Sequence, residues 1–413
     1  MKFNKWTVGL AAVGVISLAS AARADEKMSQ VQTALSNTTI SGYVDTSAMW
    51  SLGSQNGGTI PAYTQGAGVA SDGFNLNAVD IALDKPEDAG SWASGYHVEL
   101  MYGPNAVGAG IPNVRQAYVV LRTPVGANGI DWKIGQFDTI IGYESSTDGA
   151  NPNYTRSYGY QIEPTTHTGI LGTYKINDMV SVSAGIANSA FAGNVGPAVS
   201  PILPPFPAPV NPAETQKTYM GSIALTGPDS WGWAKGATLN AGIIDALNSQ
   251  GGFGNAGNTW LYAGATLPTP ISALKFGASL DYRERHNGGN TIFTPPGSNP
   301  SDDSSWDAAL YTTYQASEKL SLNLRAEYLD DGAAVLYVPG SPVGTGFAGG
   351  NTRHEATEFT ATVQYQLWAN VLSRVELRWD HVGAKAFDTA SGGPVTAIHD
   401  NAILLALNLI YQF

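Results

Sequence analysis

The stretch that decides the fold runs from Leu320 to Asp330 and reads LSLNLRAEYLD. Apolar and polar residues alternate along it, giving two faces: Leu320, Leu322, Leu324, Ala326 and Tyr328 against Ser321, Asn323, Arg325 and Glu327. A period of two residues indicates a β-strand, because successive side chains of a strand point to opposite sides. The stretch therefore predicts a strand with one apolar and one polar surface.

The same alternation recurs along most of the chain. Segments 274–283 and 371–380 repeat it clearly, with charged residues on one face and aliphatic or aromatic residues on the other. Marking every such run predicts about sixteen strands of roughly ten residues, the length that crosses a bilayer when tilted. The predicted strands are 39–50, 74–84, 92–103, 114–123, 130–140, 165–176, 179–188, 217–227, 236–246, 259–268, 273–284, 306–316, 320–330, 356–368, 371–382 and 400–413.

The connections between these strands alternate in length. Short links such as 85–88 and 177–178 alternate with long ones rich in Gly, Pro, Asn and Ser. The long links are 51–73, 141–164, 189–216, 285–305, 331–355 and 383–399, with medium links at 104–113 and 247–258. Short turns at one rim and long loops at the other are typical of outer-membrane barrels, whose even strand number places both ends on the periplasmic side. The predicted fold class is all-β, a transmembrane antiparallel β-barrel of about sixteen strands.

Composition narrows the class of protein. Charged residues make up only 13% of the 413 residues, against about 25% in ordinary soluble domains. The formal net charge of −12 argues against a nucleic-acid partner, because such proteins carry basic patches. The chain has no Cys, and its six His lack the close spacing of a zinc site. No nucleophile elbow or phosphate-binding loop is present, so we expect no enzyme, no cofactor and no metal site.

The first residues read as a secretory signal peptide. Lys2 and Lys5 precede an apolar stretch over 6–22, and Ala22-Arg23-Ala24 forms a cleavage site of small residues. An uncleaved anchor is the alternative, but the apolar run is near the lower limit for crossing a bilayer. We expect cleavage after Ala24, with residues 1–24 as signal peptide and 25–413 as the barrel domain, exported to the bacterial outer membrane.

Several features favour a membrane barrel with a wet interior. The predicted polar faces carry opposite charges side by side, as in Arg374, Glu376, Arg378 and Asp380, which suits a water-filled lumen. A closed barrel also satisfies every backbone polar group within lipid. The last strand alternates up to Phe413, and a terminal aromatic residue of this kind is an assembly signal, so we expect the outer-membrane assembly machinery and outer-membrane lipid as partners. Sixteen strands are enough to leave an aqueous channel.

Segment 136–169 is the most distinctive part of the chain. It contains Gly142-Tyr143-Glu144, Asn153-Tyr154-Thr155-Arg156-Ser157 and His167-Thr168-Gly169. In these motifs the chain resembles the OmpL-like outer-membrane β-barrel porin family, with Thr155 at a position where Ser is expected. The resemblance implies a passive channel for small polar solutes and ions, in a Gram-negative bacterium.

In sixteen-stranded porins the third long loop folds into the pore, and here that loop is 141–164. The resemblance therefore implies an inward-folded loop whose side chains form a constriction: Glu144, Asp148, Asn151, Asn153, Tyr154 and Arg156. The alternative is a loop that runs over the surface, as most loops do. Analogy with other sixteen-stranded porins also suggests a homotrimer.

Strand alternation predicts which charged side chains line the pore wall. They are Arg122, Lys133, Arg283, Arg325, Arg374, Arg378, Glu99, Asp131, Asp281, Glu327, Glu376 and Asp380. Separated clusters of opposite sign would create a field across the pore, whereas charges that compensate in pairs would have no effect on transport. Because the third long loop holds more acidic than basic residues, we expect a weak cation preference.

Two other interpretations stay open from the sequence. A non-conducting structural or adhesion barrel would act through its long loops, including a stiff Pro-rich segment at 197–212. A secreted soluble β-protein would share the alternation but bury its apolar faces against each other.

Overall fold

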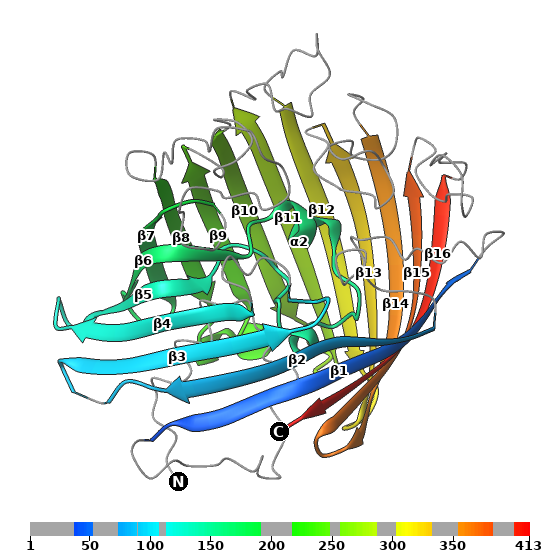
Figure 1. Cartoon of the computed structure of the whole chain (residues 1–413), viewed down its shortest axis with the longest axis horizontal. Helices are drawn as coiled ribbons and strands as arrows, with labels where there is room; N and C mark the ends of the chain where they lie inside the picture. Colours follow the sequence, from blue (N-terminus) through cyan, green and yellow to red (C-terminus); the bar gives the residue numbers. More distant parts are fainter. Residues whose placement is uncertain are drawn as a thin grey trace, which may run out of the picture.

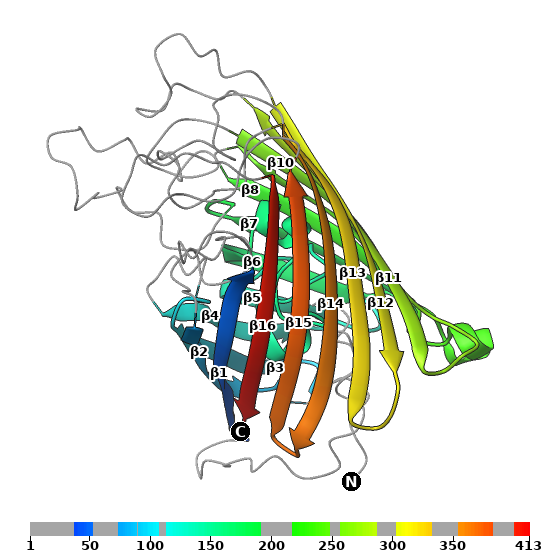
Figure 2. The same ribbon diagram turned by 90° about the vertical axis from the view of Figure 1, so that its right-hand side faces the viewer.

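The computed structural model describes residues 37–52, 73–88, 90–106, 113–190, 217–247, 257–286, 303–332, 354–382 and 400–413. Within these residues, sixteen strands form one closed barrel in which each strand pairs antiparallel with its neighbours in the sequence (Figure 1). The first strand closes the ring by pairing with the last, and the two lie side by side in Figure 2. The predicted signal peptide and the Pro-rich segment 197–212 lie outside the described residues.

All sixteen predicted strands are confirmed, with ends that differ by a few residues at most. They are β1 (Thr39–Leu52), β2 (Gly73–Lys85), β3 (Ala93–Tyr102), β4 (Val114–Thr123), β5 (Ile130–Asp138), β6 (Thr166–Lys175), β7 (Val180–Ala187), β8 (Thr218–Thr226), β9 (Thr238–Ala246), β10 (Gly257–Pro268), β11 (Leu274–His286), β12 (Asp303–Gln315), β13 (Leu320–Asp331), β14 (His354–Trp368), β15 (Val371–Val382) and β16 (Asn401–Gln412). The described residues also contain three short helical segments: η3 (Asp148–Ala150), α2 (Tyr158–Ile162) and η5 (Asp229–Ala234). Within the described residues, no helix is long and apolar enough to cross a membrane.

The barrel is apolar outside and polar inside. On β13, for example, Leu324 is 55% exposed, whereas its neighbour Arg325 is 1% exposed. Because successive side chains alternate across the closed sheet, the exposed aliphatic and aromatic side chains cover the outer surface and the buried charged ones face the interior. A soluble barrel would show the opposite arrangement, so this outer surface suits lipid.

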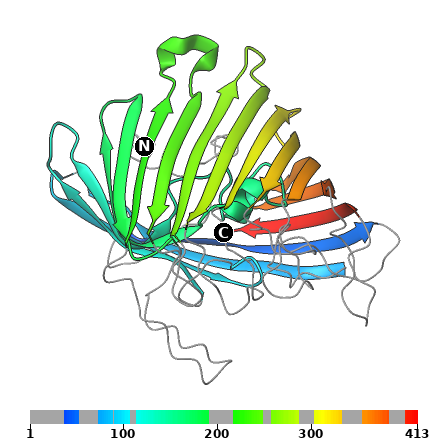
Figure 3. The same ribbon diagram turned by 90° about the horizontal axis from the view of Figure 1, so that it is seen from above.

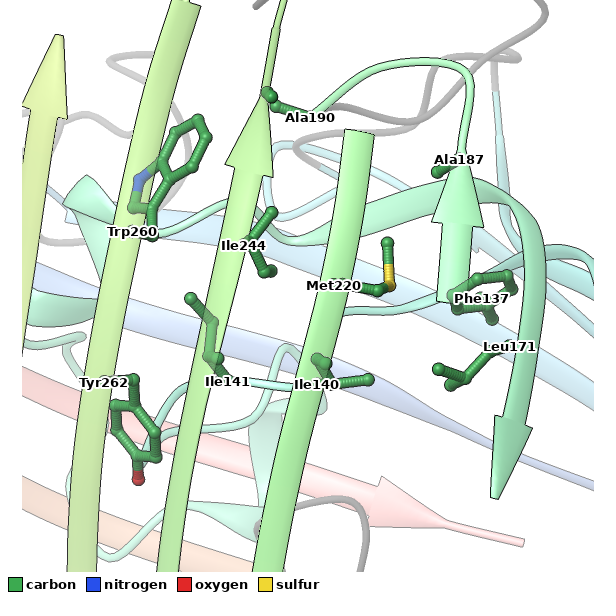
Figure 4. Packing of buried hydrophobic residues seen from close by; sticks show 11 residues of the cluster. Phe137, Ile140, Ile141, Leu171, Ala187, Ala190, Met220, Ile244, Trp260 and Tyr262 are labelled. Atoms are coloured by element: carbon green, nitrogen blue, oxygen red, sulfur yellow. The ribbon is translucent and has the colours of Figure 1, made fainter. Parts of the chain in front are cut away.

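An apolar cluster occupies part of the interior (Figure 4). Phe137, at the end of β5, and Ile140 and Ile141, which follow it, are buried in this cluster. Their partners come from the inner faces of β6 to β10 and the start of the β7–β8 connection: Leu171, Ala187, Ala190, Met220, Ile244, Ala246, Trp260 and Tyr262. The cluster holds the beginning of the segment between β5 and β6 against one side of the wall.

Segment 139–165, which joins β5 to β6, carries η3 and α2. Figure 3, which looks from above, shows α2 inside the curve of the strands. The helix contacts β11, β12 and β13, which are far from β5 and β6 around the ring. Its first turn is capped by Ser157, whose side chain accepts a hydrogen bond from the Tyr160 N–H. The segment therefore reaches across the barrel from the strands that it joins.

Candidate channel interior

The two ends of segment 139–165 lie against each other, and we call this contact the neck of the segment. The Thr139 N–H donates to the Thr165 carbonyl over 2.9 Å. Gly142 has a φ of +110° and lies directly against the Glu163 carboxylate, where a Cβ would not fit. The neck brings the two ends of the segment together, so the residues between them form one excursion from the wall.

Three arginines of the far wall donate to backbone carbonyls of this excursion. Arg374 on β15 reaches the Asp148 carbonyl at 3.0 Å and the Asn151 carbonyl at 2.6 Å. Arg325 on β13 donates to the Thr155 carbonyl at 2.7 Å, and Arg378 on β15 to the Arg156 carbonyl at 2.6 Å. The carbonyls of Asn151, Thr155 and Arg156 lie outside the helices and strands, so the guanidinium groups supply the hydrogen bonds that regular structure would otherwise provide.

Carboxylates of the same wall accept from backbone N–H groups of the excursion. Glu376 on β15 accepts from Tyr154 at 2.5 Å and from Thr155 at 2.8 Å. Glu327 on β13 accepts from the Tyr158 N–H at 2.5 Å. The Tyr158 hydroxyl donates to Asp380 on β15 at 2.6 Å. Alternating wall arginines and carboxylates thus match the alternating carbonyl and N–H groups of the loop backbone.

The two loop carboxylates predicted for a constriction are buried and paired. Glu144 is 7% exposed and accepts from Arg325 at 2.7 Å, and Asp148 is 1% exposed and accepts from Arg156 at 2.9 Å. Asp148 also accepts from Asn105, over 2.9 Å. Their charges are therefore compensated within the protein.

The other predicted loop residues hold the segment in shape or dock it. Asn151 accepts from the Ser145 N–H at 2.8 Å and donates back to the Ser145 carbonyl at 2.7 Å. Asn153 donates to Thr362 on β14 at 2.7 Å, and the Tyr154 hydroxyl lies 3.7 Å from the Met49 sulfur on β1. All are buried.

The wall of β2 to β5 is arranged differently. Arg122 pairs with Asp131 at 2.6 Å and with Glu87 at 3.0 Å, near the short-turn rim. Glu99 pairs with Arg115 at 2.5 Å. These charges compensate one another within the wall itself.

Two predicted basic wall residues have aromatic partners. The Lys133 ammonium lies 4.8 Å from the centroid of the Tyr118 ring. The Arg283 guanidinium lies 5.2 Å from the centroid of the Trp260 ring and donates to Asn258 at 2.9 Å.

Arg115 was missed by sequence reasoning, although it joins Glu99, Asp138 and the loop. Its guanidinium lies 2.6 Å from Asp138 and 3.5 Å from the Thr147 hydroxyl. The pairing of β3 with β4 skips Arg115, because the register shifts between Glu99 opposite Gln116 and Leu100 opposite Val114. A β-bulge of this kind breaks strict alternation, so counting by twos along the sequence cannot place the side chain.

A group of carboxyl groups has fewer partners. Asp281 on β11 and Asp307 on β12 are directly opposite in the register, and both contact Gly159 of α2. Among the described residues, both carboxylate oxygens of Asp307 and one oxygen each of Asp281 and Glu163 have no hydrogen-bond partner. Burial and the neighbouring Asp281, Glu144 and Asp307 raise the pKa of Glu163 well above its ordinary value. Among the residues that the structure describes, no group of three or more His, Asp or Glu side chains is arranged to hold a metal ion.

Comparison with known proteins identifies the family. The sequence profile of the family described as beta-barrel porin-2, OmpL-like, matches residues 37–413. No curated protein matches the chain.

Among solved structures, OmpF of Salmonella typhi in complex with daunomycin is 12% identical, with a TM-score of 0.55, over 93% of this chain and all (100%) of that one. The outer membrane channel DcaP of Acinetobacter baumannii is 12% identical, with a TM-score of 0.54, over 93% of this chain and 99% of that one. The anion-selective porin from Comamonas acidovorans is 12% identical, with a TM-score of 0.52, over 91% and 99%. At this identity the similarity concerns the fold alone, which is that of outer-membrane β-barrels. The family profile covers nearly the whole chain, and this match shows that the chain belongs to the OmpL-like β-barrel porin family.

Proposed function

We propose that this protein forms a water-filled channel in the bacterial outer membrane for passive diffusion of small polar solutes and ions. The observation that carries the proposal is the distribution of polarity: a sixteen-strand ring with aliphatic side chains outside and charged side chains inside. A ring of this size leaves room for an aqueous lumen. Family and fold agree with a channel rather than an enzyme.

We further propose that segment 139–165 narrows this lumen. The supporting observations are its contacts with β13, β14 and β15, which are far from its own strands around the ring.

Swelling of liposomes tests the proposal. Proteoliposomes placed in isosmotic sugars of increasing size swell if the sugar enters through the protein. We expect small sugars to enter and entry to fall steeply with size, because the loop narrows the lumen. Absence of swelling with any sugar would favour the alternative of a non-conducting barrel that acts through its long loops.

The weak cation preference expected from the sequence stays part of the proposal, but the carboxylates of the third long loop no longer support it. Glu144 and Asp148 are compensated by Arg325 and Arg156. The formal net charge of the chain is −12, and this acidic balance supports the preference. Net negative charge around a narrow lumen favours cations, most strongly at low salt.

The mature protein and its assembly complete the proposal. We propose that the signal peptide is cleaved after Ala24, that residues 25–413 form the barrel, and that Phe413 directs assembly in the outer membrane. Phe413 exchanges backbone hydrogen bonds with Gly42 at 3.0 and 3.1 Å, at the seam where the barrel closes. A homotrimer is proposed by analogy with OmpT of Vibrio cholerae, which has been solved in a trimer form and is 12% identical, with a TM-score of 0.55.

A further inference from the structure

Two arginines of the inner wall differ from the others. Arg115, Arg122, Arg325 and Arg378 each pair with a carboxylate, and Arg374 donates to loop carbonyls. Arg283 and Arg285 on β11 form no ion pair within the described part of the chain. Each of the two residues is half-buried, so part of each remains exposed.

These arginines belong to one compact patch, which we call the β11 patch: Asn258, Trp260, Arg283 and Arg285. In the register of β10 with β11, Arg283 is opposite Trp260 and Arg285 is opposite Asn258. Arg283 and Arg285 are two residues apart on one strand, so their side chains share the inner face. The patch lies at the end of β11 that leads into a long loop, away from the short-turn rim.

The patch has hydrogen-bond donors that lack acceptors. Asn258 is 1% exposed, and its Oδ1 atom accepts from the Nε atom of Arg283 at 2.9 Å. Within the described residues, the Nδ2 atom of Asn258 and the buried Nε atom of Arg285 have no hydrogen-bond partner. A buried donor left without an acceptor destabilises the protein, so the arrangement favours a ligand that brings acceptors.

The charge of the patch indicates what kind of ligand this is. Two guanidinium groups on the same face repel each other, and a bound anion would relieve the repulsion. Guanidinium forks match the paired oxygens of carboxylate and phosphate, with which they form bidentate hydrogen bonds. Trp260 supports Arg283 from one side, which fixes the direction of its donors.

Two acidic residues, Asp331 and Asp281, lie near the patch. Asp331 on β13 is fully buried and accepts from the Ser305 hydroxyl at 2.7 Å. Asp281 is two residues before Arg283 on β11. These acids lower the local positive potential, so recognition depends on the directed donors more than on net charge.

We propose that Asn258, Arg283 and Arg285 form a subsite that binds the carboxylate or phosphate group of an anionic solute at the long-loop end of the lumen. The proposal rests on the channel function for its physiological role, but binding itself does not require conduction. The anion subsite is compatible with the cation preference proposed for the whole channel. The preference reflects the total charge, whereas the subsite is one local group of donors that binds a ligand with several acceptor oxygens.

Calorimetric titration of the detergent-solubilised full chain tests the subsite, with inorganic phosphate in one arm and succinate in the other. We expect the wild type to bind at least one of the two. The Arg283→Gln, Arg285→Gln double variant should bind at least tenfold more weakly. The matched control is the Lys235→Gln, Lys319→Gln double variant, which removes two positive charges from exposed positions outside the lumen and should bind like the wild type.

Each outcome bears on a defined claim. Absence of binding of both anions to the wild type overturns the subsite, as does equal binding by the Arg283→Gln, Arg285→Gln variant. Circular dichroism of that variant checks that the barrel is folded, and Asn258→Ala, which keeps both arginines, should weaken binding several-fold. If the wild type binds the anions but never conducts current in a bilayer, the subsite stands and the channel function fails.

Discussion

At the scale of the residue, alternation along the strands predicted which charges face the interior but not what they contact. Arg325, Arg374 and Arg378 are inside, as their parity indicates. Their partners are backbone atoms about 170 to 230 positions away in the sequence, and the period of a single strand carries no information on such contacts. Alternation did not identify Arg115 as an inward-facing residue, because a β-bulge shifts the register at this point of β4. The alternation within one strand therefore tells which side of the barrel wall a side chain faces. Its hydrogen-bond partners depend on the closed barrel, which brings distant segments together.

Glu163 gives a prediction on pH dependence. Its pKa is raised by burial and by Asp281, so the folded state favours the neutral acid. The contribution of Glu163 to the stability of the folded protein is fully present below the ordinary pKa of glutamate, about 4.3. It is lost as the pH rises from there toward the raised pKa of the folded state, by about 1.4 kcal/mol for each pH unit. We expect the melting temperature of the wild type to fall from pH 5 to pH 9 more than that of Glu163→Gln, measured by circular dichroism in detergent.

The control for this comparison is Glu318→Gln, in an exposed short turn between β12 and β13. It should follow the wild type at every pH. Parallel melting curves for Glu163→Gln and the wild type would contradict the assignment of a neutral, buried Glu163.

At the scale of the element, the sixteen strands were predictable and the course of segment 139–165 was predictable only in part. Its polar and aromatic residues stood out in the sequence, but Ile140 and Ile141 did not, because two consecutive isoleucines have no distinguishing period. They anchor the segment in an apolar cluster contributed by five other strands. These residues come together only in the folded barrel, so the sequence alone does not reveal the cluster.

Arg374 provides the prediction at this scale. It donates to the carbonyls of Asp148 and Asn151, and hydrogen bonds from a charged group contribute about 1.5–3 kcal/mol each. Arg374→Gln should loosen the part of the segment around η3 while leaving the strands paired. We expect larger current fluctuations and a wider range of conductance levels in single-channel recordings.

Lys235→Gln, at an exposed position between β8 and β9, removes the same charge away from the segment and should record like the wild type. Unchanged fluctuations in Arg374→Gln would mean that segment 139–165 does not border the conducting path.

At the scale of the whole molecule, the acidic balance predicts the sign of ion selectivity. The formal net charge of the chain is −12. We expect a cation-selective reversal potential across a KCl gradient at neutral pH. The preference should weaken as salt is raised, since the screening length falls from about 10 Å at 0.1 M to about 3 Å at 1 M. An anion-selective potential at low salt would contradict this sign.

The central claim is that the closed, polar-lined barrel conducts. Single-channel recording of the purified full chain in a planar lipid bilayer tests it most directly. The structure predicts stepwise increases in current as each protein inserts, with an ohmic conductance in KCl. Heat-modifiable, folded protein that inserts into the bilayer and never produces a conductance step would contradict it.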